Sequence, residues 1–275
     1  MKTSTKAIAA ILLGGIATMA SAHEMFLKPV SFYLPANARV MVDLFNGTFD
    51  KSENPITRDR MADVSVMVGG KRTHPAPGQW SDDKISSHLA LKLGGPGTYA
   101  IGLSSRPKLL TLPAKEFDAY LKHDGLTDVL AQRQREKPAP TPVTERYSKH
   151  VRAVVQVGRT LTDDAARPLG YPTELLLLQN PAILKAGSTL TFKALYRGKP
   201  LANQIVYGSY EGFHGHDASG GHINKVTVRT KADGTASFRI DRAGKWYLTM
   251  INMRKVNEPG VTYESNWSTV TFQVR

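Results

Sequence analysis

The placement of histidine is the feature of this sequence that points most directly to chemistry. Three of the eight histidines and one aspartate lie within nine residues of each other: His214, His216, Asp217 and His222. If the chain is extended there, His214 and His216 share a face, and the neighbouring glycines let the backbone turn ligands inward. This segment predicts a metal site, with Asp217 as a ligand or as a support that orients an imidazole. A polar loop with chance histidines is the alternative interpretation.

Imidazole and carboxylate donors suit Ni²⁺, Co²⁺, Cu²⁺ or Zn²⁺, and intrinsic affinities favour Cu²⁺. The chain has no cysteine. Thiolate zinc sites, iron–sulfur clusters, disulfide scaffolds and cysteine nucleophiles are therefore excluded. Any metal here must be held by His, Met, carboxylate or backbone groups.

His23 is a further candidate ligand, because we expect it to begin the exported chain. Lys2 and Lys6 precede an apolar run at residues 7–19, and residues 20–22 (Ala-Ser-Ala) form a small-residue cleavage site. The run is too short for a comfortable membrane span. We therefore expect cleavage after Ala22, a periplasmic location and no stable membrane span in the mature protein.

An N-terminal histidine offers its α-amino nitrogen and its ring Nδ1 to one metal ion. A second histidine completes a three-nitrogen brace that suits Cu²⁺ or Ni²⁺. The α-amino group has a reference pKa near 8, so its deprotonation at neutral pH costs little. The alternative is that His23 is merely the residue that follows the cleavage site.

The 275-residue chain is basic, with a formal net charge of +13. Removal of Lys2 and Lys6 with the leader would leave +11. The basic residues are spread along the chain, whereas nucleic-acid binding needs a clustered basic patch. We expect no nucleic-acid partner and interpret the charge as a general attraction to anionic envelope surfaces.

Signatures of enzymes are missing. Gly-x-Ser-x-Gly, Walker A and His-Glu-x-x-His patterns are absent from the sequence. We therefore predict that the protein is not an enzyme. The remaining catalytic alternative is an oxidative copper enzyme built on a histidine brace at His23.

Apolar residues alternate with polar ones in many short runs, as in β-strands. Examples are Val40, Val42 and Leu44, then Val64, Val66 and Val68, then Leu89, Leu91 and Leu93, and later Leu190 and Phe192, Phe238 and Ile240, and Val270, Phe272 and Val274. Runs end in turn residues such as Asn46-Gly47. Short strands at this spacing favour β-sandwich domains.

The middle of the chain carries a different period. Phe117, Tyr120 and Leu121 fall on one helical face, which predicts helices over Ala114–His123 and Thr127–Glu136. A proline-rich tether follows. We expect a mostly β fold of two antiparallel, Ig-like β-sandwich domains, at residues 23–106 and 144–275, joined by a helical insert and tether at residues 107–143.

The two β-rich regions match each other like distant copies. Leu91 and Tyr99 correspond to Phe238 and Trp246 at an offset of 147, and Val40 corresponds to Leu190 at an offset of 150. Generic sandwich patterning is the alternative, but an internal repeat agrees with two related domains.

Several segments, in order along the chain, resemble the DUF4198 family. They are Ala-His-Glu-Met-Phe-Leu-Lys-Pro at 22–29, the insert at 117–126, Glu-Arg-Tyr-Ser-Lys at 145–149, Gly-x-Pro-x-Glu-Leu at 170–175, Gly-Lys-Pro-Leu at 198–201, Ala-Asp-Gly at 232–234, Gly-x-Trp at 244–246 and Trp-x-x-Val-Thr-Phe at 267–272. The resemblance implies an exported two-domain β protein associated with nickel and cobalt uptake, with His23 in the family pattern. Phe26 replaces a usual Trp, and residues 214–222 match no family motif.

The leading hypothesis is a periplasmic protein that captures or delivers a divalent transition metal, Ni²⁺ or Co²⁺ with Cu²⁺ as a further candidate, to an uptake transporter in the envelope. The alternative is a non-catalytic envelope adaptor that binds a protein or glycan through its β-sandwich surface. In that case, exposed Tyr207, Tyr210 and Phe213 would form the contact.

Overall fold

The structure is a computed structural model that describes residues 24–216 and 222–275. The strands before the helices are β1 (Glu24–Pro29), β2 (Tyr33–Leu34), β3 (Arg39–Gly47), β4 (Met61–Val68), β5 (Lys71–Thr73), β6 (Trp80–Asp82), β7 (Ser87–Lys92), β8 (Gly97–Ser105) and β9 (Lys108–Leu112). Helices α1 (Ala114–His123) and α2 (Thr127–Glu136) follow, with the bounds that the sequence predicts.

The remaining strands are β10 (Val143–Val157), β11 (Thr173–Leu177), β12 (Thr189–Tyr196), β13 (Lys199–Pro200), β14 (Ile205–Tyr210), β15 (Gly215–His216), β16 (His222–Ile223), β17 (Val226–Arg229), β18 (Thr235–Arg239), β19 (Gly244–Glu258) and β20 (Val261–Val274). The predicted fold class, mostly β with a short helical insert, is confirmed.

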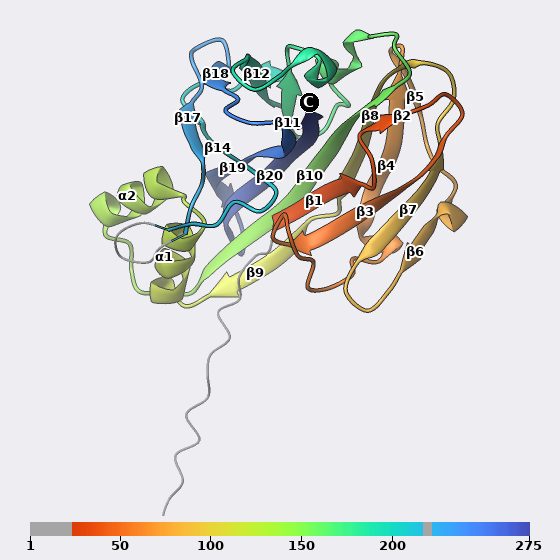
Figure 1. Cartoon of the computed structure of the whole chain (residues 1–275). Coiled ribbons are helices and arrows are strands. Elements are labelled where there is room, and N and C mark those ends of the chain that lie inside the picture. The colour runs from red at the N-terminus through yellow and green to blue at the C-terminus, as the bar shows by residue number, and fades with distance from the viewer. Residues whose placement is uncertain (1–23, 217–221) are drawn as a thin grey trace, which may run out of the picture.

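One long sheet runs through the whole molecule (Figure 1). This central sheet has the strand order β17-β14-β19-β20-β10-β8-β4-β5, and β2 and β9 add to β10. At its middle, β10 and β20 pair in parallel from Glu145 opposite Tyr263 to Ala153 opposite Thr271. The two predicted domains thus share a sheet, and their division at residues 106/107 and 143/144 stays a prediction.

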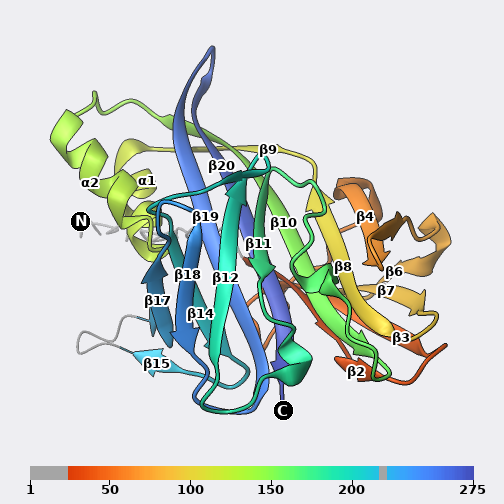
Figure 2. The same ribbon diagram turned by 90° about the horizontal axis from the view of Figure 1, so that it is seen from above.

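Two smaller sheets cover the central sheet. The first cover sheet has the order β1-β3-β7-β6, and the second contains β11, β12, β13 and β18. Figure 2 shows β11, β12 and β18 in front of the long strands β19 and β20, whereas β3, β6 and β7 lie beyond β8. Each sandwich therefore has its own cover sheet.

The cover sheets lie on opposite faces of the central sheet. Side chains alternate along a strand, and on β10 Val151, Ala153 and Val155 enter the core under the first cover sheet. Val154 enters the core under the second. Each cover sheet thus covers only half of the central sheet, and the other half of each face must be covered by something else.

The internal repeat is visible in the strand register. Val40 on β3 pairs with Leu91 on β7, and the equivalent Leu190 on β12 pairs with Phe238 on β18. The offset of 150 relates Val40 to Leu190, and the offset of 147 relates their strand partners Leu91 and Phe238. The paired strands of the two cover sheets therefore correspond to each other, so the two sandwiches are built alike.

The helical insert covers the face of β19 and β20 that the second cover sheet does not. Phe117 is fully buried, and its ring stacks on Tyr263 with centroids 5.4 Å apart. Arg133 lies over the Phe117 ring at 5.1 Å and donates to Asp118 at 2.7 Å. None of the helices described is long and apolar enough to cross a membrane.

Replacement of Phe117 by alanine should detach the insert from the sheet. Loss of a fully buried phenylalanine typically costs about 3–5 kcal/mol, so the free energy of unfolding, measured in urea, should fall by about that amount. Leu109→Ala is the control, because Leu109 is 63% exposed and its loss should cost less than about 0.5 kcal/mol. Equal effects of the two changes would contradict this role for Phe117.

Candidate functional site

The predicted histidine ligands lie on a short hairpin that leaves the edge of the molecule beside β14 and β17 (Figure 2). Strands β15 and β16 pair His216 directly opposite His222. His214 precedes them, with its side chain 72% exposed and its Nε2 4.0 Å from Oδ2 of Asp50. His23 and Asp217 lie outside the described residues.

No group of three or more His, Asp or Glu side chains in the described part of the chain is arranged to hold a metal ion. The predicted ligand set falls partly outside that part. The assignment of His23, His214, His216, Asp217 and His222 to a metal therefore stays a prediction.

The other histidines have local protein partners. His150 is buried, bonded to Ser104 at 2.9 Å, and burial lowers its pKa to about 4, so it is neutral. His88 lies between Asp43 and Asp83, and its hydrogen bond to Asp43 contributes most to raising its pKa. His74 and His123 are largely exposed beside aspartates. Structural or solvent roles explain all four.

A cluster of buried ionisable groups, not predicted from the sequence, lies on the central sheet between the helical insert and the first cover sheet. This polar cluster consists of Glu24, Asp124, Glu145 and Lys149. Glu24 starts β1, Asp124 directly follows α1, and Glu145 and Lys149 share a face of β10 at even spacing. The electrostatic interactions among the four groups show that they belong to one site.

Glu24 is the first described residue, and its side chain points into the cluster. Its Oε1 accepts a hydrogen bond from Thr249 Oγ1 at 3.2 Å. Burial and, to a lesser extent, the charge of Asp124 raise the pKa of Glu24 to about 7, against the opposing effects of Thr249 and Lys149. Glu24 therefore changes its charge close to neutral pH.

Glu145 lies under α1 and behaves similarly. Its Oε1 accepts hydrogen bonds from Tyr120, at 3.2 Å, and from Ser265. Its Oε2 is buried and accepts no hydrogen bond from any described residue. Burial raises the pKa of Glu145 to about 7. A buried carboxylate oxygen without a donor favours the protonated acid.

Lys149 is the cation of the cluster. Burial lowers its pKa to about 8, although Glu24, Asp124 and Glu145 act against that shift. Its ammonium group lies 5.0 Å from the centroid of the Trp267 ring. Two acids and one amine thus titrate within about one pH unit of neutrality, which is typical of functional sites as well as of buried ion-pair networks.

The cluster escaped the sequence analysis because its members are far apart in the chain. Glu24 follows His23, but no second histidine completes a His-Glu-x-x-His pattern, and Asp124 lies in an Asp-Gly turn. The alternation of Glu145, Tyr147 and Lys149 on one strand is the only local signal. Nothing in one sequence says that this face of β10 meets α1 and β1.

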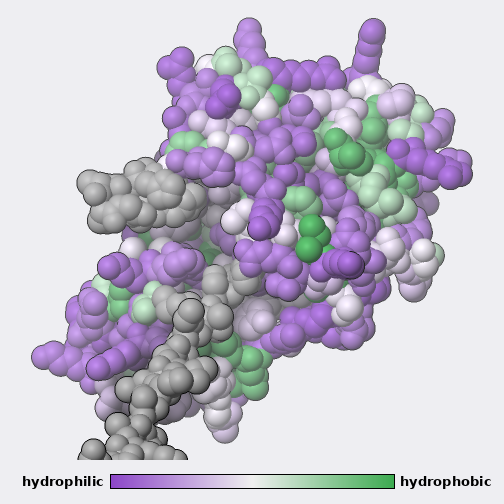
Figure 3. Space-filling view, turned by 60° about the horizontal axis from the view of Figure 1, so that its bottom comes forward, coloured by the Kyte–Doolittle hydropathy of each residue, from purple (hydrophilic) through white to green (hydrophobic). Residues whose placement is uncertain are grey.

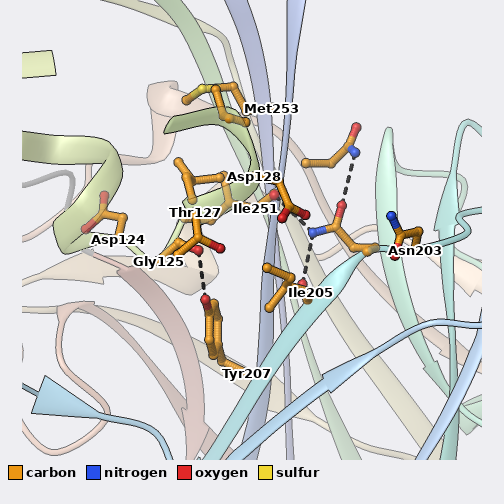
Figure 4. A pocket seen from close by; sticks show the side chains of 13 residues that line it. Asp124, Gly125, Thr127, Asp128, Asn203, Ile205, Tyr207, Ile251 and Met253 are labelled. Atoms are coloured by element: carbon orange, nitrogen blue, oxygen red, sulfur yellow. Dashed lines mark hydrogen bonds between the residues drawn. The ribbon is translucent and has the colours of Figure 1, made fainter. Parts of the chain in front are cut away.

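A small cavity of about 110 Å³ adjoins the cluster, between the α1–α2 turn and strands β14 and β19 (Figure 4). Tyr207 closes one side, with its hydroxyl donating to Gly125 O at 2.7 Å. Gln204 also lines the cavity, and its Oε1 accepts a hydrogen bond from Asn252 Nδ2 at 3.1 Å. Hydrogen bonds to neighbouring groups thus hold its polar walls in place.

The expectation of an exposed aromatic surface is wrong. Tyr207, Tyr210 and Phe213 are each half-buried. The Tyr210 ring packs edge-on against Phe213 and Trp246, with centroids 5.2 and 5.0 Å away. The Tyr207 hydroxyl is bonded to Gly125 in the insert and Tyr210 packs on β19, so none of the three rings is fully exposed.

Comparison with known families identifies the chain's relatives. The DUF4198 family, described as a domain of unknown function, matches residues 20–254. The chain belongs to the DUF4198 family. No curated protein matches the chain in sequence.

Solved structures with some likeness include the D0–D1 domain of intimin, at 10% identity and a TM-score of 0.21, covering 90% of this chain and 96% of that one. The Yersinia pseudotuberculosis adhesin InvE is 15% identical, with a TM-score of 0.23 and coverage of 90% and 58%. The Bacteroides ovatus glucan-utilization protein SGBP-B, solved with a mixed-linkage heptasaccharide, is 10% identical, with a TM-score of 0.19 and coverage of 91% and 46%.

The polar cluster makes stability depend on pH. Glu145 has a folded pKa of about 7, above its ordinary value of 4.5, so its protonated form stabilises the fold. That stabilisation is complete below pH 4.5 and is lost as the pH rises to about 7. At about 1.4 kcal/mol per pKa unit, the loss amounts to roughly 3 kcal/mol.

Glu145→Gln should therefore flatten the fall in the free energy of unfolding between pH 4.5 and 7, because glutamine is neutral throughout. Urea unfolding at several pH values measures this. Glu116→Gln, on the exposed side of α1, is the control and should leave the slope as in the wild type. A Glu145→Gln profile parallel to the wild type would show that Glu145 does not titrate in this range.

Proposed function

We propose that this protein is an exported, non-catalytic metal-binding protein that captures a divalent transition metal, Ni²⁺ or Co²⁺ with Cu²⁺ as a further candidate, through the histidine hairpin. The observation that carries the proposal is the register of β15 and β16, which pairs His216 with His222. Directly opposite residues of an antiparallel pair hold Cβ atoms about 5 Å apart. At that spacing two imidazoles can share one ion.

Two further features support a metal at this end of the molecule. His214 is separated by one residue from His216, and the hairpin rests on Asp50, which accepts a hydrogen bond from the Gly212 backbone N–H at 3.0 Å. His23, the predicted mature N-terminus, is bonded to Glu24, whose carboxylate lies in the polar cluster. Amino, imidazole and carboxylate donors together suit Ni²⁺, Co²⁺ or Cu²⁺.

Under this proposal the protein works in the periplasm and hands its metal to an uptake transporter in the envelope. A metal site on the hairpin suits transfer, because the described part of the hairpin projects from the edge of the sheet (Figure 2) and His214 is exposed. The alternative, an adaptor that binds a protein or glycan, predicts no metal requirement.

The hairpin histidines can be tested by calorimetric titration of the secreted protein with Ni²⁺, Co²⁺, Cu²⁺ and Zn²⁺. We expect one tight site, and His216→Ala or His222→Ala should weaken it at least about tenfold, since even loss of a partner that only orients a ligand costs about that much. His74→Ala is the control, because the His74 side chain is 62% exposed beside Asp63, away from the hairpin. If the wild-type protein binds metal no more tightly than a variant with His214, His216 and His222 all replaced by alanine, the adaptor alternative is favoured.

The N-terminal ligand needs a separate experiment. Mass spectrometry of the secreted protein should show His23 as its first residue. A variant that keeps Ala22 ahead of His23 turns the α-amino nitrogen into an amide and prevents the six-membered chelation by that nitrogen and the ring Nδ1. Metal affinity should then fall more than it does in His74→Ala. Unchanged affinity would remove His23 from the site while leaving the hairpin proposal intact.

A further inference from the structure

A second cavity, of about 260 Å³, lies next to the polar cluster on the side of β9 and the first cover sheet. Strand β9, which contributes Lys108 to the lining, lies at the bottom of Figure 1, and Figure 3 turns that side of the molecule forward, where hydrophilic residues dominate the surface. Its size is near the lower end for ligand pockets, about 300–1,000 Å³. It is therefore suited to a small molecule and too small for a chain segment.

Three cationic side chains from separate elements line this cavity. Arg60 ends the turn Arg58–Arg60 before β4, Lys108 begins β9, and Lys149 lies on β10. The register of β9 and β10 pairs Lys108 with Tyr147, two residues before Lys149. The fold thus gathers three cationic side chains around one hollow. Lys149 also interacts with the acids of the polar cluster, and the charge of Arg60 opposes its protonation, so an anion in the hollow would reduce the repulsion among the cations.

The cavity also offers hydrogen-bond donors. Arg60 uses Nη1 to bond Arg106 O at 3.0 Å. Its other guanidinium nitrogens, the hydroxyl of Tyr147 and the side-chain amide of Asn46 make no hydrogen bond within residues 24–216 and 222–275. Met25 and Ile56 supply an apolar wall.

No aspartate or glutamate is among the described residues that line the cavity. The acids that act on Lys149 belong to the polar cluster and are not among the residues that line the cavity. The neighbouring Asp59 accepts the hydroxyl of Thr57 and is fully exposed. We infer that this cavity is a binding site for a small anion with a carboxylate or phosphate group, held by Arg60, Lys108 and Tyr147 beside Lys149.

This site is independent of the proposed metal function, and the test keeps the two apart. The secreted protein, in metal-depleted buffer of constant ionic strength, is titrated by calorimetry with sodium phosphate and, separately, with sodium succinate. We expect saturable one-to-one binding of at least one probe. Phosphate alone would identify a phosphate site and succinate alone a carboxylate site, and either result supports the inference.

Arg60→Gln/Lys108→Gln should lower the affinity for the bound probe at least about tenfold, because each change removes a charged hydrogen-bond donor. The charge-matched control is Lys185→Gln/Lys199→Gln, two exposed lysines far from the cavity, which should stay within about twofold of the wild type. Tyr147→Phe removes only a hydroxyl and should weaken binding several-fold without a change of fold.

Three outcomes would overturn the inference. One is that neither probe binds more tightly than about 10 mM. Another is that Arg60→Gln/Lys108→Gln, shown by thermal unfolding to be folded, binds as the wild type does. The last is that the control double variant loses as much affinity, which would reduce the effect to net charge. His216→Ala should bind the anion like the wild type, so failure of the metal site leaves this result unaffected.

Discussion

The parallel pairing of β10 with β20 is the constraint on which the rest of the structure depends. It joins two similar sandwiches edge to edge into one sheet. Because the cover sheets lie on opposite faces, most of β10 is buried on both sides: every residue from 148 to 157 is buried, and only Thr144, Arg146 and Tyr147 are half-buried. A strand buried on both faces usually reads as a continuous apolar run. β10 instead carries Glu145, Lys149 and Arg152, and the structure must accommodate them.

Those charges lie where each cover sheet stops. On the face of the first cover sheet, the helical insert takes over beyond β1, and the junction holds Glu145 and Lys149. On the other face, the segment before β11 takes over, and Arg152 donates there to Arg167 O at 2.8 Å. An isolated buried charge is costly, so the acids become easier to protonate and Lys149 easier to deprotonate. The ionisable groups near neutrality are therefore a direct result of joining two sandwiches with opposed covers.

Patterns within short stretches of the sequence predicted the features that depend on short stretches of the chain. The helices at Ala114–His123 and Thr127–Glu136 and the alternating strands follow from periodicity within a few residues, and the repeat follows from matched spacings. The union of β10 with β20 joins segments more than one hundred residues apart, and nothing in either strand specifies its partner. The half-burial of Tyr207 likewise depends on a hydrogen bond to Gly125 in the insert, a contact that an aromatic stretch read alone cannot show. The polar cluster combines residues from three such distant elements, which is why single-motif reasoning passed over it.

Lys149 links the two chemical environments that this architecture creates. On one side it faces carboxyl groups beside the predicted mature N-terminus, and on the other it borders a cavity lined by Arg60 and Lys108. An anion in the cavity would favour the charged form of Lys149, and a charged Lys149 would in turn favour ionised Glu24 and Glu145. Occupancy of the cavity and the protonation of the polar cluster would therefore be thermodynamically coupled through one buried lysine, and such coupling is reciprocal.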